Sequence, residues 1–544
     1  MPTVTIQCGQ AGNQLGQELW GLLASQPQVR EPAAAGLQWD AGLSSSSEFF
    51  RADAQGCKQA RCLLVDTEPK VVNSILASSG NGGIFSRQNC FTGHSGRGNN
   101  WAYGYSQIIP SRSSGMSSRI PRWNNSTAVE DPNTQEAHLL DHLQEGIRKE
   151  CEAVDGAPDF LMLHSLGGGS GSGLGSRILE CLREEYPLNY IATVSVAPRP
   201  AGDSPMQSLN STMALSFLQA YADVVMVYDN QAMLEAAMKS QKTANMADVN
   251  YHIALSALGA LWPLSPGEPY SGDGRIRDMA TTVAADSCLK LVEARTSAVP
   301  AASGVKGLWR DASLAVARLF PRFDVLDAHN PIITSSALLL ARGFPPETLQ
   351  PSPPPKSLLP PQPKLSRASS SSAVTMSDDC GVGDHEGGIG TRRPAGRAAA
   401  MREVPLSAEA SATAASTFVQ ASHGAASFAC PPDAVNSIWS RHGPCKLSLA
   451  RTNTAGEASK RKSAIAGMKS EGGTMALTAV ANRSSAIGLL SRIGDKARLM
   501  SQSGAYLHWF ERYGCSKAAL DDALETVDNM ADAYRLAHGI RDFL

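Results

Sequence analysis

The sequence predicts an α/β protein built around a parallel sheet, and three observations lead to this prediction. Strand-like and helix-like segments alternate over residues 1–229, as they do in α/β nucleotide-binding domains. A glycine run at residues 164–176 lies between an apolar, strand-like segment and a helix-like segment. A second glycine-containing turn, at residues 7–16, again joins a strand-like to a helix-like segment. Both turns would open on the same edge of the sheet if their strands are parallel.

Further strand-like segments end in polar residues, which suggests a single pocket. Residues 62–65, 191–197 and 224–228 are apolar runs of strand length. Because ligands bind beyond the carboxyl ends of strands in an open parallel sheet, we expect these ends to meet at one site. The sequence finishes with two amphipathic helical segments, at about 485–501 and 517–538.

Composition limits the possible functions. The 544 residues suffice for two or three domains, and the net charge of −2 gives no bias toward nucleic acid or anionic membranes. No run of about 18 apolar residues occurs, so we expect no membrane span. The first residues lead directly into a strand-like segment, so we do not expect secretion. Eleven scattered cysteines without a Cys-x-x-Cys pair indicate a reducing cytosol.

The glycine run has the properties of a phosphate cradle. Residues without Cβ atoms let backbone N–H groups approach an anion, and the following helix adds its dipole. The run contains no Gly-Lys-Ser/Thr, so it is not a Walker loop. A flexible linker is one alternative. A Rossmann dehydrogenase is another, but it requires an acidic residue on a second strand about 20 residues further on, and Glu184 and Glu185 lie in helix-like sequence.

The sequence divides into three predicted regions. Residues 1–229 form a nucleotide-binding domain with a Ser-, Arg- and Asn-rich insertion at about 110–132. Residues 230–482 form a core helix and a second α/β domain. That region carries a Pro-, Ser- and Ala-rich insertion at about 345–435, which we expect to be disordered because it buries too little apolar surface. Residues 483–544 form a C-terminal helical region.

Five segments, in this order, resemble the tubulin superfamily. They are residues 6–14 (IQCGQAGNQ), 65–69 (VDTEP), 98–104 (GNNWAYG), 164–173 (HSLGGGSGSG) and 505–510 (AYLHWF). Serine stands at position 170, where the superfamily usually has threonine. Residues 99–106 are most similar to the delta-tubulins, and the epsilon-tubulins are the next most similar group. The resemblance implies a tubulin-like GTP-binding parallel-sheet domain, a second α/β domain and C-terminal helices.

The resemblance also implies site residues for GTP or GDP with Mg²⁺. Glu68 would hold the ion through water and Asp66 would orient its shell, since Mg²⁺ favours carboxylate and phosphate oxygens. Met246 stands where tubulins usually stack a tyrosine on the base. The remaining implied contacts are Gln10 with the phosphates, Gln14 near the base, Asn99 and Asn100 with the γ-phosphate, Ser165 with the α-phosphate, Gly168, Gly169, Ser170 and Gly171 as the cradle, Asp203 with the ribose, and Asn230 and Asn250 with guanine.

Each of these residues also has a structural alternative. Gln10 and Glu68 could cap helices, and Asn99 and Asn100 could serve plain turn chemistry. Asn230 or Asn250 taken alone would more often be structural.

Hydrolysis departs from the superfamily pattern. There, a loop of the next subunit completes the reaction, and alpha-tubulin supplies a glutamate. Thr281 stands at that position here, and threonine cannot act as a general base near neutral pH. Asp278, one turn away, is the candidate substitute.

We therefore expect GTP binding more than self-stimulated hydrolysis. The expected setting is the cytoplasm and cytoskeleton, at a centriole or basal body, in triplet-microtubule assembly and cilium formation. The expected partners are alpha-, beta- or epsilon-tubulin and microtubule ends, with no nucleic acid. An actively hydrolysing lattice GTPase, or an epsilon-type protein, is the alternative.

Overall fold

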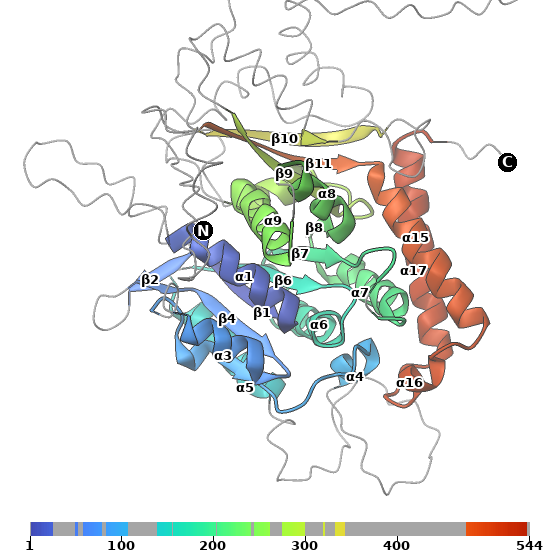
Figure 1. Cartoon of the computed structure of the whole chain (residues 1–544), viewed down its shortest axis with the longest axis horizontal. Coiled ribbons are helices and arrows are strands. Elements are labelled where there is room, and N and C mark those ends of the chain that lie inside the picture. The colour runs from blue at the N-terminus through green and yellow to red at the C-terminus, as the bar shows by residue number, and fades with distance from the viewer. Residues whose placement is uncertain are drawn as a thin grey trace, which may run out of the picture.

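A computed structural model gives the fold of the chain (Figure 1). The described residues are 2–24, 49–52, 58–78, 83–106, 139–154, 156–202, 204–240, 244–261, 275–299, 319–320, 332–342 and 475–540. The two predicted insertions, at about 110–132 and 345–435, and the predicted ribose contact Asp203 lie outside the described residues.

One large sheet forms the centre of the molecule. Its strand order is β10-β11-β9-β8-β7-β6-β1-β4-β5. All neighbouring pairs from β9 to β5 are parallel, which confirms that the two glycine turns open on the same edge. The strands are β1 (Thr3–Cys8), β4 (Cys62–Asp66), β5 (Cys90–Thr92), β6 (Asp159–Ser165), β7 (Ile191–Ala197), β8 (Val224–Asp229) and β9 (Leu291–Val299), and a separate pair comprises β2 (Phe50–Ala52) and β3 (Lys58–Ala60).

The central strands read as near-continuous apolar runs because helices cover both of their faces. Every residue of β1, β4 and β7 is buried. Two separate hydrophobic cores lie on the two faces. Alternate side chains divide between them, so that Phe160 and Met162 enter one core and Leu161 and Leu163 enter the other.

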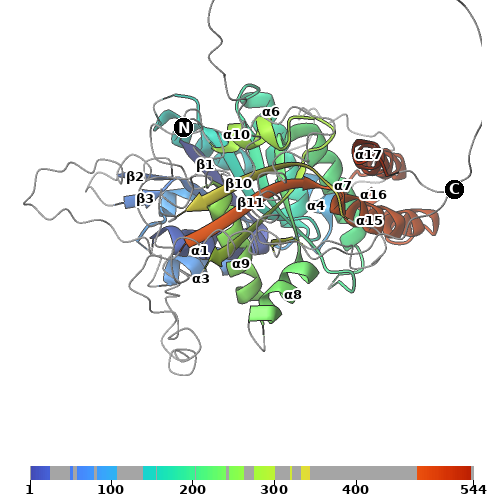
Figure 2. The ribbon, with the colours of Figure 1, turned by 90° about the horizontal axis from the view of Figure 1, so that it is seen from above.

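Helices from different parts of the chain supply the two covering layers (Figure 2). One core contains side chains of α4 (Trp101–Ser106), α5 (Leu139–Glu152), α6 (Gly175–Glu185), α7 (Gln207–Tyr221), α15 (Ser485–Gln502) and α17 (Lys517–Ala537). The other contains side chains of α1 (Gly9–Ala24), α3 (Pro69–Ala77), α8 (Asn230–Ser240), α9 (Met246–Leu261) and α10 (Arg275–Thr282).

The second region continues the same sheet. β9 pairs in parallel with β8 through Val225–Leu291 and Met226–Val292. β11 (Met475–Arg483) then pairs antiparallel with both β9 and β10 (Thr334–Arg342). The three predicted domain boundaries stay predictions, and the described strands of the second region extend the first sheet.

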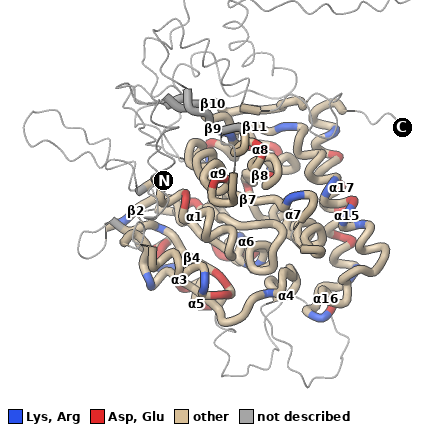
Figure 3. Tube along the Cα trace, in the orientation of Figure 1, with Lys and Arg blue, Asp and Glu red and all other residues tan. Residues whose placement is uncertain are grey.

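The C-terminal helices pack beside α7, at the right of Figure 1. α15 and α17 lie against each other, and the short α16 (Leu507–Glu511) lies against α4. Charges of both signs are spread along α15 and α17 (Figure 3). Among the described helices, none combines the length and the hydropathy needed to cross a lipid bilayer.

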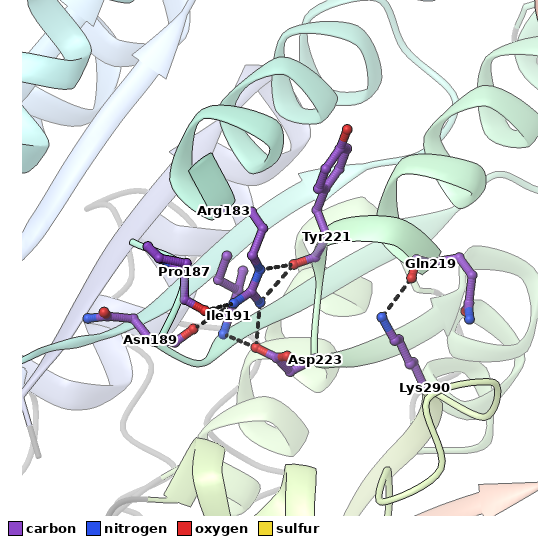
Figure 4. Close-up of polar contacts among 8 residues, drawn as sticks. All are labelled: Arg183, Pro187, Asn189, Ile191, Gln219, Tyr221, Asp223 and Lys290. Carbon is purple, nitrogen blue, oxygen red and sulfur yellow. Dashed lines mark hydrogen bonds and ion pairs between the residues drawn. The ribbon is translucent and has the colours of Figure 1, made fainter. Parts of the chain in front are cut away.

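Arg183 of α6 bonds several residues at the amino edge of the sheet (Figure 4). Its guanidinium pairs with Asp223 at 2.7 Å, and the same carboxylate oxygen accepts the backbone N–H of Ile191 at 2.7 Å. Its N–H groups also donate to the carbonyl oxygens of Pro187, Asn189 and Tyr221. The starts of β7 and β8 are thereby tied to the end of α6.

Candidate functional site

The carboxyl ends of five parallel strands meet at one edge of the sheet. These ends are Cys8, Asp66, Ser165, Ala197 and Asp229. β1 lies between two groups of strands. β4 and β5 follow on one side of it, and β6, β7 and β8 follow on the other. The order therefore reverses beside β1, which is where ligands bind in open parallel sheets.

The glycine run packs directly on the first turn. Gly9 has a positive φ of 73°, and a Cβ there would lie 2.7 Å from the backbone N of Gly171. The first turn therefore cannot carry a side chain at this contact, which explains the glycine at position 9. Residues 170–174 form a π-helical turn before α6, a form of helix often found at functional sites.

Two neighbouring glycines of the run face different surroundings. A Cβ on Gly169 would lie 2.8 Å from Cβ of Arg97 and 3.0 Å from N of Asn100, so this glycine is needed for packing against the 97–100 loop. A Cβ on Gly168 would meet no atom within 4 Å. The open side of the cradle is therefore at Gly168.

The buried His164, at the end of β6, is hydrogen-bonded to the glycine run. Its Nδ1 donates to the carbonyl oxygen of Gly171 at 3.0 Å, so Nε2 accepts the hydroxyl hydrogen of Ser195 at 2.7 Å. Burial lowers the pKa of His164 to about 4, against a weaker opposing effect from the Gly171 carbonyl. The ring is thus neutral near pH 7, and a single tautomer satisfies both partners.

Ser165 and Ser170 lie at opposite ends of the cradle. Ser165 Oγ accepts the backbone N–H of Gly167 at 3.2 Å, and Ser170 Oγ lies 2.6 Å from Thr67 Oγ1. Cys8 Sγ donates to the Ser170 carbonyl oxygen at 3.5 Å. Thr67 therefore ties the cradle to the turn that follows β4, a contact that no sequence motif indicated.

The two predicted magnesium residues occupy that same turn. Asp66 is buried, and its Oδ1 accepts the backbone N–H of Thr67 at 2.7 Å. Burial raises the pKa of Asp66 to about 6. Glu68 is exposed and precedes α3 without capping it through its side chain. The capping alternative for Glu68 therefore has no support in its side-chain hydrogen bonding. In the described part of the chain, no group of three potential metal ligands gathers.

The 97–100 loop turns sharply before α4. Gly98 and Asn99 have positive φ values of 54° and 51°, and the Asn99 side chain is exposed. Asn100 is buried, and its Oδ1 accepts the backbone N–H of Ala102 at 2.9 Å. Its Nδ2 donates to the carbonyl oxygen of Trp509 at 2.9 Å. The predicted turn chemistry is present at Asn100, and the γ-phosphate contacts of both residues stay predictions.

The start of α1 presents Gln10 and Gln14 to solvent, one helical turn apart. Asn13, between them, is buried instead. Its Nδ2 donates to the carbonyl oxygens of Gly9 and Val65, each at 2.9 Å, and so joins the first turn to the end of β4. The resemblance did not single out Asn13, although it lies inside the first matching motif.

The predicted guanine contacts lie on two successive helices. Asn230 begins α8, and its Oδ1 is buried without a hydrogen-bond partner among the described residues. Asn250 is half-buried on α9, and Met246, at the start of that helix, is exposed. An orphaned amide oxygen costs free energy unless a ligand satisfies it, so Asn230 is a plausible point of contact.

The Asn210 side chain makes three hydrogen bonds at this edge, and sequence reasoning missed it. Its Nδ2 donates to the carbonyl oxygens of Asn99 at 2.7 Å and Gly167 at 2.9 Å. Its Oδ1 accepts the backbone N–H of Trp101 at 2.9 Å. In the sequence, the feature that could have indicated Asn210 is its position inside a helix-like segment, where asparagine is disfavoured.

The predicted catalytic residue Asp278 lies at the opposite edge. It is in α10, whose neighbouring Arg277 stacks over the ring of Tyr190 with a centroid distance of 5.1 Å. Tyr190 immediately precedes β7, so α10 lies at the amino ends of the strands. A strand of this length separates the two edges by roughly 20 Å. Within one chain, Asp278 does not reach the glycine cradle.

Comparisons with known proteins agree with this geometry. Residues 2–122 and 122–238 match the family model described as "Tubulin/FtsZ family, GTPase domain". The chain is 30% identical over 269 residues to the tubulin beta-3 chain of Echinococcus multilocularis, covering 49% of this chain and 54% of that protein. It is 32% identical over 257 residues to the tubulin beta-8 chain of Oryza sativa subsp. japonica, covering 47% and 51%. The chain thus spans about half the length of the curated relatives it matches.

Proposed function

We propose that residues 2–238, which match the model of the Tubulin/FtsZ family GTPase domain, form such a domain and bind GTP or GDP with Mg²⁺ at the carboxyl edge of the sheet. The proposal depends on the open space beside Gly168, where a Cβ would have no atom within 4 Å. A cradle made of glycine backbone, with free space on one side and the entry to α6 behind it, suits a phosphate group.

The site also has suitable residues for the two ends of the nucleotide. The buried, unpartnered Oδ1 of Asn230 can accept an N–H group, and guanine presents N–H groups where adenine does not. At the phosphate end, the exposed carboxylate of Glu68 follows the buried Asp66. Two carboxylates are too few for an all-protein magnesium site, so the ion would be held together with phosphate oxygens and water.

A matched pair of glycine variants tests the cradle. Gly168→Val adds a branched side chain where the structure has open space, so we expect it to abolish nucleotide retention while the melting temperature stays within 2–3 °C of wild type, about the shift that a small stability change produces. Gly83→Val is the control, because Gly83 also has open space around its Cβ and adjoins Ile84, which bonds Ala60 of the separate β2–β3 pair.

The measurement is nucleotide identification in the purified full chain by chromatography after denaturation. Wild type and Gly83→Val should release a guanine nucleotide, and Gly168→Val should release none. Equal retention by both variants would contradict the cradle, and a wild-type protein that never yields guanine nucleotide would contradict the proposal as a whole.

At finer detail, we propose a delta-type tubulin acting in centriole or basal-body microtubule assembly and cilium formation. Residues 99–106 support this assignment, since they are most similar to the delta-tubulins. Other tubulins and microtubule ends are the partners that follow from it. A tagged chain expressed in ciliated cells should concentrate at basal bodies, whereas uniform incorporation along cytoplasmic microtubules would favour the alternative, an ordinary lattice GTPase.

A further inference from the structure

An ion pair joins the C-terminal helix α15 to the turn that starts α8. Arg492 of α15 contacts Asp229 Oδ2, and both side chains are about three-quarters buried, with 26% and 21% of their surface exposed. Asp229 is the last residue of β8, and Asn230 is the first residue of α8. The pair therefore lies next to the proposed guanine contact, on residues 263 positions apart in sequence.

The two oxygens of Asp229 have separate partners. Oδ1 accepts the backbone N–H groups of Gln231 at 2.7 Å and Ala232 at 3.2 Å, which caps the first turn of α8. Oδ2 takes the Arg492 guanidinium. With one oxygen held by the arginine, the carboxylate plane is fixed and the other oxygen stays directed at the helix. The backbone of Asn230 lies in this capped turn, between the capping residue and the capped N–H groups.

Side-chain packing does not fill the space between α8 and α15 around this ion pair. A cavity of about 220 Å³ lies between α8, β9 and α15, and both members of the ion pair line it. The other carboxylates on its wall have other partners, since Glu235 accepts from Gln231 and Glu293 contacts Arg483 and Ser485. Among the described residues, Asp229 is therefore the residue that Arg492 contacts across this cavity.

We propose that Arg492 is a positioning residue for guanine recognition. It acts through Asp229 on the first turn of α8 and so makes the C-terminal helices part of the nucleotide site. This inference rests on the proposed function, because it concerns which base Asn230 selects. Removing Arg492 should lower affinity for the base and leave the phosphate cradle, which is the glycine run between β6 and α6, unchanged.

The test compares Arg492→Met with Arg498→Met in the full chain. Both changes remove one guanidinium from α15 and keep an aliphatic stem, and Arg498 pairs with Asp528 and Asp495 on the outer surface. We measure dissociation constants for GTP, ATP and inorganic tripolyphosphate on nucleotide-free protein. Arg492→Met should lose about tenfold in GTP affinity relative to ATP, the size of one hydrogen bond, with tripolyphosphate affinity unchanged.

A double-mutant cycle identifies the route. Asp229→Asn keeps an oxygen to cap α8 but loses the charge that Arg492 contacts. If Arg492 acts through Asp229, then the double variant should be no worse than either single variant. Arg492→Lys, which restores a positive charge, should recover part of the selectivity.

The failures of the two proposals are distinguishable. A wild-type chain that binds tripolyphosphate but shows no preference for GTP over ATP would overturn guanine recognition itself. A selective wild type with equal selectivity in Arg492→Met and Arg498→Met would overturn the role of Arg492 alone. Equal loss of GTP and tripolyphosphate affinity in Arg492→Met would also overturn it, because that pattern indicates general destabilisation.

Discussion

At the residue scale, neutral polar side chains position the backbone around the cradle. His164 holds the Gly171 carbonyl, Asn13 joins α1 to β4, and Asn210 joins the glycine run to the 97–100 loop. Each is buried and bonds backbone groups. The glycine cradle could be predicted from sequence, because a glycine run between a strand and a helix is typical of phosphate sites. Asn210 and Thr67 could not, because their partners are distant in sequence and their residue types are ordinary.

The neutral His164 makes stability depend on pH. Its pKa is about 4 in the folded protein and 6.5 in the unfolded chain, so between these values the unfolded chain binds the extra proton. Its contribution to stability is complete above pH 6.5 and is lost as pH falls through 4. From pH 7 to pH 5, the loss should be about 2 kcal/mol.

Denaturant titrations of wild type and His164→Gln at pH 7 and pH 5 measure this effect. Glutamine can still donate to Gly171 but does not titrate, so the variant should lose less stability between the two pH values. Identical losses in the two proteins would show that His164 is not the titrating group.

At the element scale, the strands were predictable and several of their connections were not. Apolar runs identified β4, β7 and β8 within one residue of their observed ends, because strands buried on both faces have no polar alternation. The predicted α/β fold class, with a tubulin-like parallel-sheet domain, is confirmed. The continuation of the sheet into β9 was not foreseen, because the pairing of β8 with β9 spans only two residue pairs and leaves no local sequence pattern.

Asn210 of α7 joins three elements, so its loss should loosen all of them together. Asn210→Leu, of similar shape, would leave the backbone groups of Asn99, Trp101 and Gly167 without their partner. We expect a loss of roughly 2–4 kcal/mol in the free energy of unfolding and faster hydrogen exchange at the Trp101 amide. Ser216→Ala, which removes only a local bond on the same helix, is the control. A variant as stable as this control would refute the bridging role.

At the scale of the whole molecule, the proposed nucleotide binding and the proposed hydrolytic function lie at opposite edges of the sheet. The glycine cradle is at the carboxyl edge, and Asp278 is on α10 at the amino edge, where its neighbour Arg277 lies over Tyr190. A chain cannot bring these edges together without unfolding the sheet between them. A second subunit stacked head to tail can do so, because its amino edge would face the first subunit's carboxyl edge.

Any GTP hydrolysis should therefore depend on association. Phosphate release per chain should rise with protein concentration, or on adding alpha- or beta-tubulin, and Asp278→Ala should remove the stimulated part, a loss of about 100- to 10,000-fold if Asp278 is the general base. GTP binding by the same variant should be unchanged, since the residue is remote from the cradle. Asp286→Ala is the matched control, because Asp286 is exposed in the turn that follows α10 and accepts the backbone N–H groups of Cys288 and Leu289 in its own loop. Turnover that is independent of concentration, or equally fast in Asp278→Ala, would rule out this division of labour between the two edges.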